Sequence, residues 1–204
     1  MKKQIVLFDF DGVIVDTETQ YTVFWNEMGR KYLGAGNFGH TIKGQTLNQI
    51  SSGHFAGKEK ALQEIVPQLD RFESEMSYEY IPGVMEFILK LKEKGVPMAI
   101  VTSSNDRKMA QAFLAHPELP ELMDAILTSE HFSRSKPDPE CFLKGMEVLG
   151  GRPEDTIIFE DSFHGIAAGR AAGAFVVGLA TTNPREALTP LCDLVIDDFT
   201  SIEI

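Results

Sequence analysis

The sequence has only two cysteines, Cys141 and Cys192, and they lie far apart in its 204 residues. They form neither a metal-ligand spacing nor a disulfide framework, so a reducing, cytoplasmic location is expected. No apolar run reaches the length of a bilayer-spanning helix, so no membrane partner is expected. The N-terminal run after Lys2 and Lys3 ends at Asp9, too early for the apolar part of a secretory signal.

Positive charge is also scarce. Nineteen Lys and Arg residues stand against 30 Asp and Glu residues, which gives a formal net charge of −11 at pH 7. No basic run or stripe interrupts this excess, and a chain of this charge repels a phosphate backbone. Nucleic acid is therefore not expected as a partner. The five histidines show no paired ligand spacing, which argues against zinc.

The apolar residues that are present occur in short runs rich in Val, Ile and Phe, separated by segments of helical character. This alternation is typical of an α/β fold with a buried parallel sheet and helices on both of its faces. The segment Gly83–Lys94 has apolar residues at helical spacing and precedes Gly95, a usual residue just past a helix end. The runs that predict strands are Ile5–Phe8, Met98–Val101, Ile126–Leu127, Ile157–Phe159 and Phe175–Val177, with a weak sixth at Asp193–Ile196.

Between Thr17 and Ile81 the strand-like runs disappear, and helix formers broken by glycines take their place. This segment leaves the predicted sheet after its first strand and returns before its second. It is therefore expected to lie over the carboxyl ends of the strands, where open α/β sheets place their ligands. We predict a catalytic core of residues 1–16 and 82–204 and a small, inserted all-helical cap of residues 17–81. A monomer is expected, and no function is predicted for residues 181–204.

The strongest local pattern follows the first predicted strand. Residues two apart on an extended chain point to the same side, so the carboxylates of Asp9 and Asp11 leave the strand end together. Two anions this close repel each other unless a cation lies between them. A calcium loop is excluded because Gly12 comes too early and Gln20 stands where that loop needs a bidentate Glu. A purely structural, helix-capping turn stays an alternative.

Two further segments offer groups that suit phosphate. Thr102, Ser103 and Ser104 follow a predicted strand and open a helix, so their hydroxyl and backbone N–H groups face outward together. For Ser104, a simple helix cap is the alternative. Lys136 stands in a segment stiffened by two prolines, which suits a point charge aimed at a phosphoryl group. Its alternative is a solvated surface lysine.

Two more carboxylates, Glu160 and Asp161, end another predicted strand. If that strand neighbours the first, they join Asp9 and Asp11 at one sheet end, where carboxylates about 4 Å apart repel by on the order of several kcal/mol. Oxygen ligands with room for water and a phosphate favour Mg²⁺ over Zn²⁺. The four acidic residues therefore predict a Mg²⁺ site.

With these residues, the chain resembles the haloacid dehalogenase-like hydrolases, specifically their subgroup of β-phosphoglucomutase and small sugar-phosphate phosphatases. The resemblance runs from the first strand to about Gly178 and rests on four motifs in the family's order. These are D-F-D-G-V-I-V-D-T at residues 9–17, V-T-S-S at 101–104, S-K-P at 135–137 and E-D-S at 160–162. The resemblance implies a Rossmann-like core with a helical cap inserted just after the first motif.

The resemblance also implies catalytic roles. Asp9 would attack phosphorus and become an aspartyl phosphate, while Asp11 would protonate the leaving oxygen and later deprotonate the hydrolytic water. Thr102 and Lys136 would hold the phosphoryl oxygens. The expected substrate-binding residues are Thr102, Ser103, Ser104 and Lys136, with Lys43 from the cap, and the expected Mg²⁺ ligands are Asp9, the backbone carbonyl of Asp11, Glu160 and Asp161.

Within this resemblance, hydrolysis of a small phosphorylated metabolite is favoured. Dehalogenases of the superfamily lack the second aspartate of the first motif, so Asp11 argues against dehalogenation. Mutase-like members have a cap His and a cap Arg where this chain has Tyr21 and Leu47. The predicted activity is hydrolysis of a sugar-phosphate-like monoester. A β-phosphoglucomutase-type mutase, a pyrophosphatase and a non-catalytic phosphate or metal sensor stay as alternatives.

Overall fold

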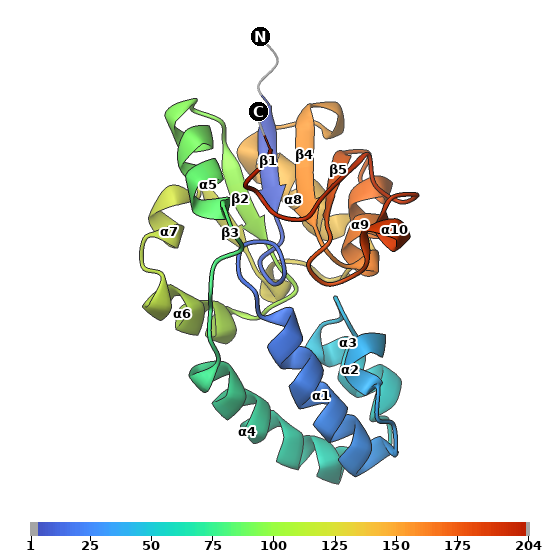
Figure 1. Cartoon of the computed structure of the whole chain (residues 1–204). Helices are drawn as coiled ribbons and strands as arrows, with labels where there is room; N and C mark the ends of the chain where they lie inside the picture. The colour runs from blue at the N-terminus through green and yellow to red at the C-terminus, as the bar shows by residue number, and fades with distance from the viewer. Residues whose placement is uncertain (1–3, 203–204) are drawn as a thin grey trace.

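The computed structural model describes residues 4–202 and shows an α/β fold, as predicted (Figure 1). Within these residues, six parallel strands form one sheet in the order β3-β2-β1-β4-β5-β6. Every predicted strand is present, including the weak sixth. The strands are β1 (Ile5–Phe8), β2 (Met98–Val101), β3 (Ala125–Leu127), β4 (Thr156–Glu160), β5 (Phe175–Leu179) and β6 (Leu194–Ile196).

Helices cover both faces of this sheet. On the central strand β1, Val6 and Phe8 belong to one apolar cluster, and Ile5 and Leu7 belong to the other. Successive strand side chains point to opposite faces, so a strand covered on both faces is apolar at every position. The first cluster includes α5 (Val84–Glu93) and α6 (Asp106–Ala115), and the second includes α8 (Glu140–Leu149) and α9 (Phe163–Ala171).

The helix predicted over Gly83–Lys94 is α5, with Gly83 and Lys94 as its caps. Gly95 has a φ of 67°, the left-handed conformation that glycine adopts without strain just past a helix end. The remaining short elements near the sheet are α7 (Leu119–Leu122), α10 (Arg185–Leu188) and the 3-10 turns η1 (Ser129–His131) and η2 (Pro153–Asp155).

Four helices follow β1 before the chain returns to the sheet, and we call them the cap helices. They lie beyond the carboxyl ends of the strands in Figure 1. Their side chains share a separate apolar cluster that includes Trp25, Phe38 and Ile65. The cap helices are α1 (Glu18–Leu33), α2 (Phe38–Thr41), α3 (Leu47–His54) and α4 (Glu59–Glu75). The division of the chain into domains at residues 17 and 81 stays a prediction.

The two chain segments that join the cap helices to the sheet run side by side. The backbone N–H of Asp16 donates to the carbonyl of Glu79 at 2.8 Å, and Val15 forms an isolated antiparallel bridge with Tyr80. The chain therefore leaves the sheet and returns to it at one place.

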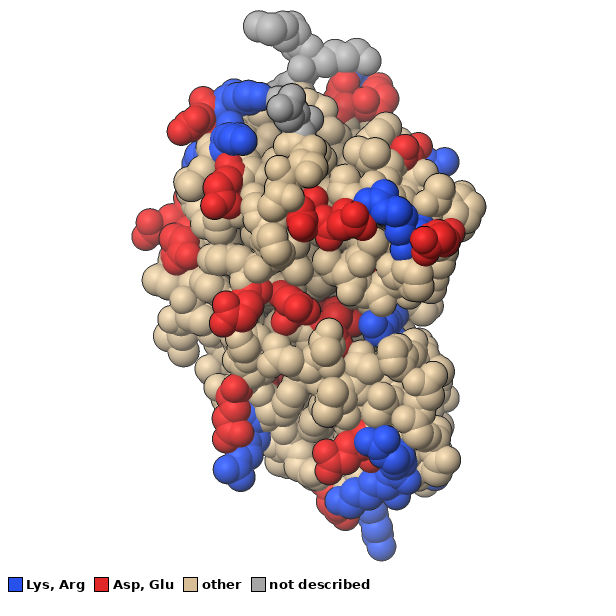
Figure 2. Space-filling view, in the orientation of Figure 1, with Lys and Arg blue, Asp and Glu red and all other residues tan. Residues whose placement is uncertain are grey.

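Among the described residues, no helix has both the length and the apolar character that crossing a membrane requires. Figure 2 shows Asp and Glu side chains spread over the visible face, with Lys and Arg side chains in small groups beside them.

Candidate active site

The carboxyl ends of three neighbouring strands bring most of the predicted residues together. Because β1 pairs with both β2 and β4, the residues that follow these strands meet at one edge of the sheet. Asp9 follows β1, Thr102 follows β2, and Glu160 ends β4. All three side chains are buried, as are Lys136 and Asp161.

Lys136 lies at the centre of this group. Its Nζ is 3.1 Å from Asp9 Oδ1 and 2.7 Å from Glu160 Oε1, and its side chain is 1% exposed. Burial lowers the pKa of Lys136, but the charges of Asp9 and Glu160 outweigh burial and leave the pKa raised. The alternative of a solvated surface lysine is therefore wrong, because two buried carboxylates hold this ammonium group in its charged form.

Three carboxylates form a compact group that could hold a metal ion. Asp9, Glu160 and Asp161 each offer an oxygen, and these oxygens lie within 4.8 Å of one another. Burial raises the pKa of Asp9 and of Asp161, and the charge of Glu160 adds to the rise in both. Asp161 Oδ2 is buried and has no hydrogen-bond partner within residues 4–202. A hard divalent cation would supply that partner and relieve the repulsion, so this group fits Mg²⁺.

Glu160 is the most fully bonded of the three. Its Oε1 accepts from Lys136, and its Oε2 accepts from the backbone N–H groups of Asp161 and Ser162 at 2.9 and 2.8 Å. Burial raises its pKa, but Lys136 and these donors outweigh burial, so the pKa is lowered. Glu160 therefore fixes both Lys136 and the turn that presents Asp161.

The carboxylate of Asp11 is bound elsewhere. Its Oδ2 accepts from Ser104 Oγ at 2.7 Å, and its Oδ1 accepts from Lys108 Nζ at 2.5 Å and from the hydroxyl of Thr17. Burial raises the pKa of Asp11, but the charge and hydrogen bond of Lys108 outweigh burial and lower it. The side chain of Asp11 is not part of the three-carboxylate group. The predicted metal contact through its backbone carbonyl stays a prediction.

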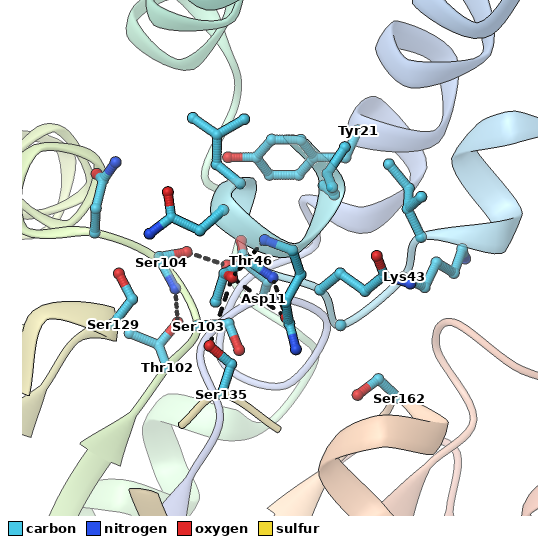
Figure 3. A pocket seen from close by; sticks show the side chains of 18 of the residues that line it. Asp11, Tyr21, Lys43, Thr46, Thr102, Ser103, Ser104, Ser129, Ser135 and Ser162 are labelled. Carbon is cyan, nitrogen blue, oxygen red and sulfur yellow. Dashed lines mark hydrogen bonds between the residues drawn. The ribbon is translucent and has the colours of Figure 1, made fainter. Parts of the chain in front are cut away.

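The predicted phosphate cradle follows β2 (Figure 3). Thr102 Oγ1 accepts from the backbone N–H of Ser104 at 3.0 Å, and Ser103 Oγ is buried with no partner among the described residues. The helix-cap alternative for Ser104 is wrong. Asn105 caps α6 by accepting from the N–H of Lys108, so α6 begins one residue later and the Ser104 hydroxyl donates to Asp11 instead.

From the cap side, Lys43 lies against the core. Its Nζ donates to the carbonyl of Thr182 at 3.2 Å, and its own carbonyl is 3.2 Å from His164 Nδ1. Gly44 has a φ of 76° and lies so near Ser162 that an added Cβ would come within 2.6 Å of the serine Oγ. Only glycine suits this position, which seats the loop against the start of α9. A substrate contact by Lys43 stays a prediction.

A cavity of about 690 Å³ separates the sheet edge from the cap helices. Asp9, Asp11, Thr102 and Asp161 line it from the core. Lys136 and Glu160 are not among its lining residues, but both contact residues of the group that lines it, Lys136 through Asp9 at 3.1 Å. The cap helices and their loops contribute Glu18, Tyr21, Trp25, Lys43, Gln45, Asn48, Gln49 and Glu73.

Sequence reasoning missed several residues beside the site. Lys108 contacts Asp11, and residues 181–204, for which no function was predicted, also contribute. Thr181 Oγ1 donates to the carbonyl of Gly12 at 2.6 Å, and Asn183 Nδ2 donates to the carbonyl of Asp161 at 2.9 Å. Only Asn-Pro and Thr-Pro turn signals and one weak strand mark residues 181–204 in the sequence, and none of them indicates a contact with the first motif.

Replacement of Lys136 by methionine is expected to destabilise the fold by about 3–5 kcal/mol, because it leaves two buried carboxylates without their cation. Urea unfolding of both proteins measures this difference. Lys144→Met is the matched control, because Lys144 is 40% exposed and pairs with Glu140 at the surface. The control is expected to change the free energy of unfolding by less than about 1 kcal/mol. Equal losses in the two variants would contradict the central role of Lys136.

Comparisons with known proteins identify the family of the chain. A family model described as haloacid dehalogenase-like hydrolase matches residues 6–179. The chain is 29% identical to validoxylamine A 7'-phosphate phosphatase of Streptomyces hygroscopicus subsp. limoneus, over 98% of this chain and 95% of that protein. It is also 29% identical to hexitol phosphatase A of Escherichia coli, over 97% of this chain and 92% of that protein.

Among solved structures, a haloacid dehalogenase-type hydrolase of family IA, variant 3, from Entamoeba histolytica matches with a TM-score of 0.82 and 25% identity. The match covers 98% of this chain and 96% of that one. The similarity therefore includes both the sheet and the cap helices.

Proposed function

Since the chain belongs to the haloacid dehalogenase-like hydrolase family, we propose that it is a Mg²⁺-dependent phosphatase that hydrolyses a small, sugar-phosphate-like monoester. The family is the one that the four motifs predict. The phosphatase class agrees with the names of the two curated relatives. The observation that carries the proposal is the buried group of Asp9, Glu160 and Asp161, in which Lys136 contacts Asp9 and Glu160. Asp9 and Asp161 of this group line a cavity large enough for a small metabolite.

Asp9 and Asp161 are the side chains that would hold Mg²⁺, with Glu160 beside them and the backbone carbonyl of Asp11 as a further ligand. The ion would neutralise charge on the phosphoryl oxygens. Lys136 orients Asp9 by its 3.1 Å contact, and the buried hydroxyl of Ser103 is a donor that a phosphoryl oxygen would satisfy.

In the proposed reaction, a carboxylate oxygen of Asp9 attacks phosphorus in line, and the bond from phosphorus to the leaving oxygen breaks. Asp11 gives the leaving oxygen its proton. Water then attacks the aspartyl phosphate, Asp11 takes the proton of that water, and phosphate leaves Asp9 free. Burial raises the pKa of Asp11 and Lys108 lowers it below its ordinary value, whereas the negative charge of a bound phosphoryl group would raise it again.

The cavity lining supports an uncharged leaving group rich in hydroxyls. Among the residues that the structure describes, no arginine lines the cavity, and its two lysines already contact Thr182 and Asp11. Acidic and neutral polar side chains make up much of the remaining lining, together with apolar and aromatic side chains that include Tyr21 and Trp25. A pyrophosphate or a second phosphate group would meet mostly acidic and neutral groups. The neutral polar lining residues include Gln45, Asn48, Gln49, Ser129 and Ser133.

Phosphate release from a panel of phosphate monoesters tests this proposal. With Mg²⁺, hexose and polyol monophosphates are expected to give kcat/KM values at least about tenfold above that of pyrophosphate, a difference of about 1.4 kcal/mol. Omission of Mg²⁺ is the control and should abolish release. Preference for pyrophosphate would favour the pyrophosphatase. Conversion of β-glucose 1-phosphate to glucose 6-phosphate without phosphate release would favour the mutase, and silence in all assays would favour the sensor.

A further inference from the structure

We propose that Lys108 is a positioning residue that holds the carboxylate of Asp11 in the orientation its acid-base chemistry requires. The inference rests on the proposed function, because it presupposes that Asp11 exchanges protons with the leaving group and with water. Lys108 belongs to none of the four motifs.

The position of the Lys108 ammonium group carries the inference. Lys108 is 3% exposed, and burying an ammonium group is costly unless partners compensate it. Its Nζ lies 2.5 Å from Asp11 Oδ1 and 4.3 Å from the centroid of the Tyr21 ring. An anion and an aromatic face therefore compensate the buried charge.

Local structure aims the side chain. Asn105 caps α6 and accepts from the backbone N–H of Lys108 at 2.9 Å, so Lys108 stands in the first turn of a helix with a fixed start. Side chains of a helix lean toward its N-terminus, which here lies at the end of β2. That end of β2 neighbours the end of β1, where Asp11 follows. The lysine is thus directed at Asp11 by the same element that carries the phosphate cradle.

Of the three donors that hold Asp11, Lys108 alone carries a charge. The other two are the hydroxyls of Thr17 and Ser104, which rotate freely when unpaired and form weaker hydrogen bonds with a carboxylate. Loss of the Lys108 ammonium group would therefore remove the strongest constraint on the Asp11 carboxylate while leaving Asp9 and its partner Lys136 in place.

The same contact connects Asp11 with the cap helices. Tyr21 lies on α1 and donates its hydroxyl to Glu73 Oε1 on α4 at 2.9 Å, so two cap helices fix the ring that Lys108 faces. Arg107, the residue before Lys108, pairs with Asp70 of α4 at 2.6 Å and also joins α6 to the cap helices. Its ion pair is with Asp70 and not with Asp11. Arg107 therefore provides a control for a merely structural link.

Lys108→Met tests the inference, because methionine keeps most of the apolar stem and removes the charge. The substrate is p-nitrophenyl phosphate with Mg²⁺, followed by stopped flow. The p-nitrophenolate group leaves without a proton, so phosphorylation of Asp9 does not need Asp11, whereas hydrolysis of the aspartyl phosphate does. The variant is expected to release about one p-nitrophenolate per site in a burst within about threefold of the wild-type rate, and then to turn over at least about tenfold more slowly than wild type.

Three comparisons accompany this measurement. Arg107→Met should leave both phases within about twofold of wild type. Lys108→Arg should recover part of the steady-state rate, because it restores the charge. Asp11→Asn should show the pattern of Lys108→Met with a slower steady state. Should Lys108→Met fail to fold, Lys108→Gln is measured in its place with the same expectation.

The inference on Lys108 is overturned if the folded variant slows the burst as much as the steady state, or if it leaves both phases unchanged while Asp11→Asn slows turnover. Wild-type turnover in Asp11→Asn would instead overturn the proposed acid-base role of Asp11. Absence of any wild-type phosphate release would overturn the proposed function itself.

Discussion

Asp9→Asn is expected to lower kcat at least about 1,000-fold, because an amide cannot act as the nucleophile that accepts the phosphoryl group. The variant should remain folded. Burial and the charge of Glu160 raise the pKa of Asp9, so its negative charge is unfavourable in the folded protein. Replacing the carboxylate by an amide removes this charge, and Lys136 keeps its 2.7 Å contact with Glu160. Phosphate release with Mg²⁺, together with a thermal melt, measures both effects.

Asp16→Asn is the matched control for this substitution. Asp16 belongs to the same motif but is exposed, and no side-chain contact joins it to the site among the described residues. Its kcat should stay within about twofold of wild type. If Asp9→Asn kept wild-type activity while folded, the nucleophile would have to be another residue.

Asp161→Asn is expected to stabilise the metal-free protein and to lower the activity measured with Mg²⁺. Its carboxylate oxygen Oδ2 is buried and unpartnered among the described residues, and burial followed by the charge of Glu160 raises its pKa. In EDTA at neutral pH the variant should therefore melt at a higher temperature than wild type. With Mg²⁺ it should lose activity by about 100-fold and lose the stabilisation that a ligand at 100 times its Kd gives, about 2.7 kcal/mol.

The pH dependence of the stability of the metal-free protein provides an independent test of the role of Asp161. A carboxyl group whose pKa is raised on folding binds its proton more tightly in the native state, so wild-type stability in EDTA should fall as pH rises through the raised pKa. Asp161→Asn should weaken this fall, whereas Asp16→Asn should not. A Mg²⁺-dependent rise in Tm that survives in Asp161→Asn would place the ion elsewhere.

The strands were predictable because each side of the sheet is covered. A strand buried on both faces is apolar at every residue, so Ile5–Phe8 and Met98–Val101 were found with the bounds that β1 and β2 have. The bounds of β5 were less well predicted. Its register with β4 continues to Gly178, and a glycine in an apolar run indicates a strand end in the sequence.

The motif residues could be predicted because chemistry restricts their types, and the strand order then explains why they meet. The role of Lys108 could not be predicted, because its partner Asp11 lies 97 positions away in the sequence and a lysine on a helix is ordinarily exposed. Thr181 and Asn183 were missed because their segment carries only turn signals and a weak strand, which indicate no contact with the site. Catalytic roles, Mg²⁺ ligands, the monomeric state, the cellular location and the absence of nucleic-acid binding stay predictions.

The paired connections at Asp16 and Glu79 have a consequence for how this protein can diverge. The backbone nitrogen of Asp16 and the carbonyl oxygen of Glu79 are 2.8 Å apart, so the ends of the inserted segment meet at the sheet. For the core, the residues between them are therefore equivalent to one closed loop. The entropy of closing such a loop grows only with the logarithm of its length, about 0.6 kcal/mol for each doubling. Insertions or deletions among the cap helices therefore cost the core little, and the cap surface that lines the cavity can be exchanged while Asp9 stays in place.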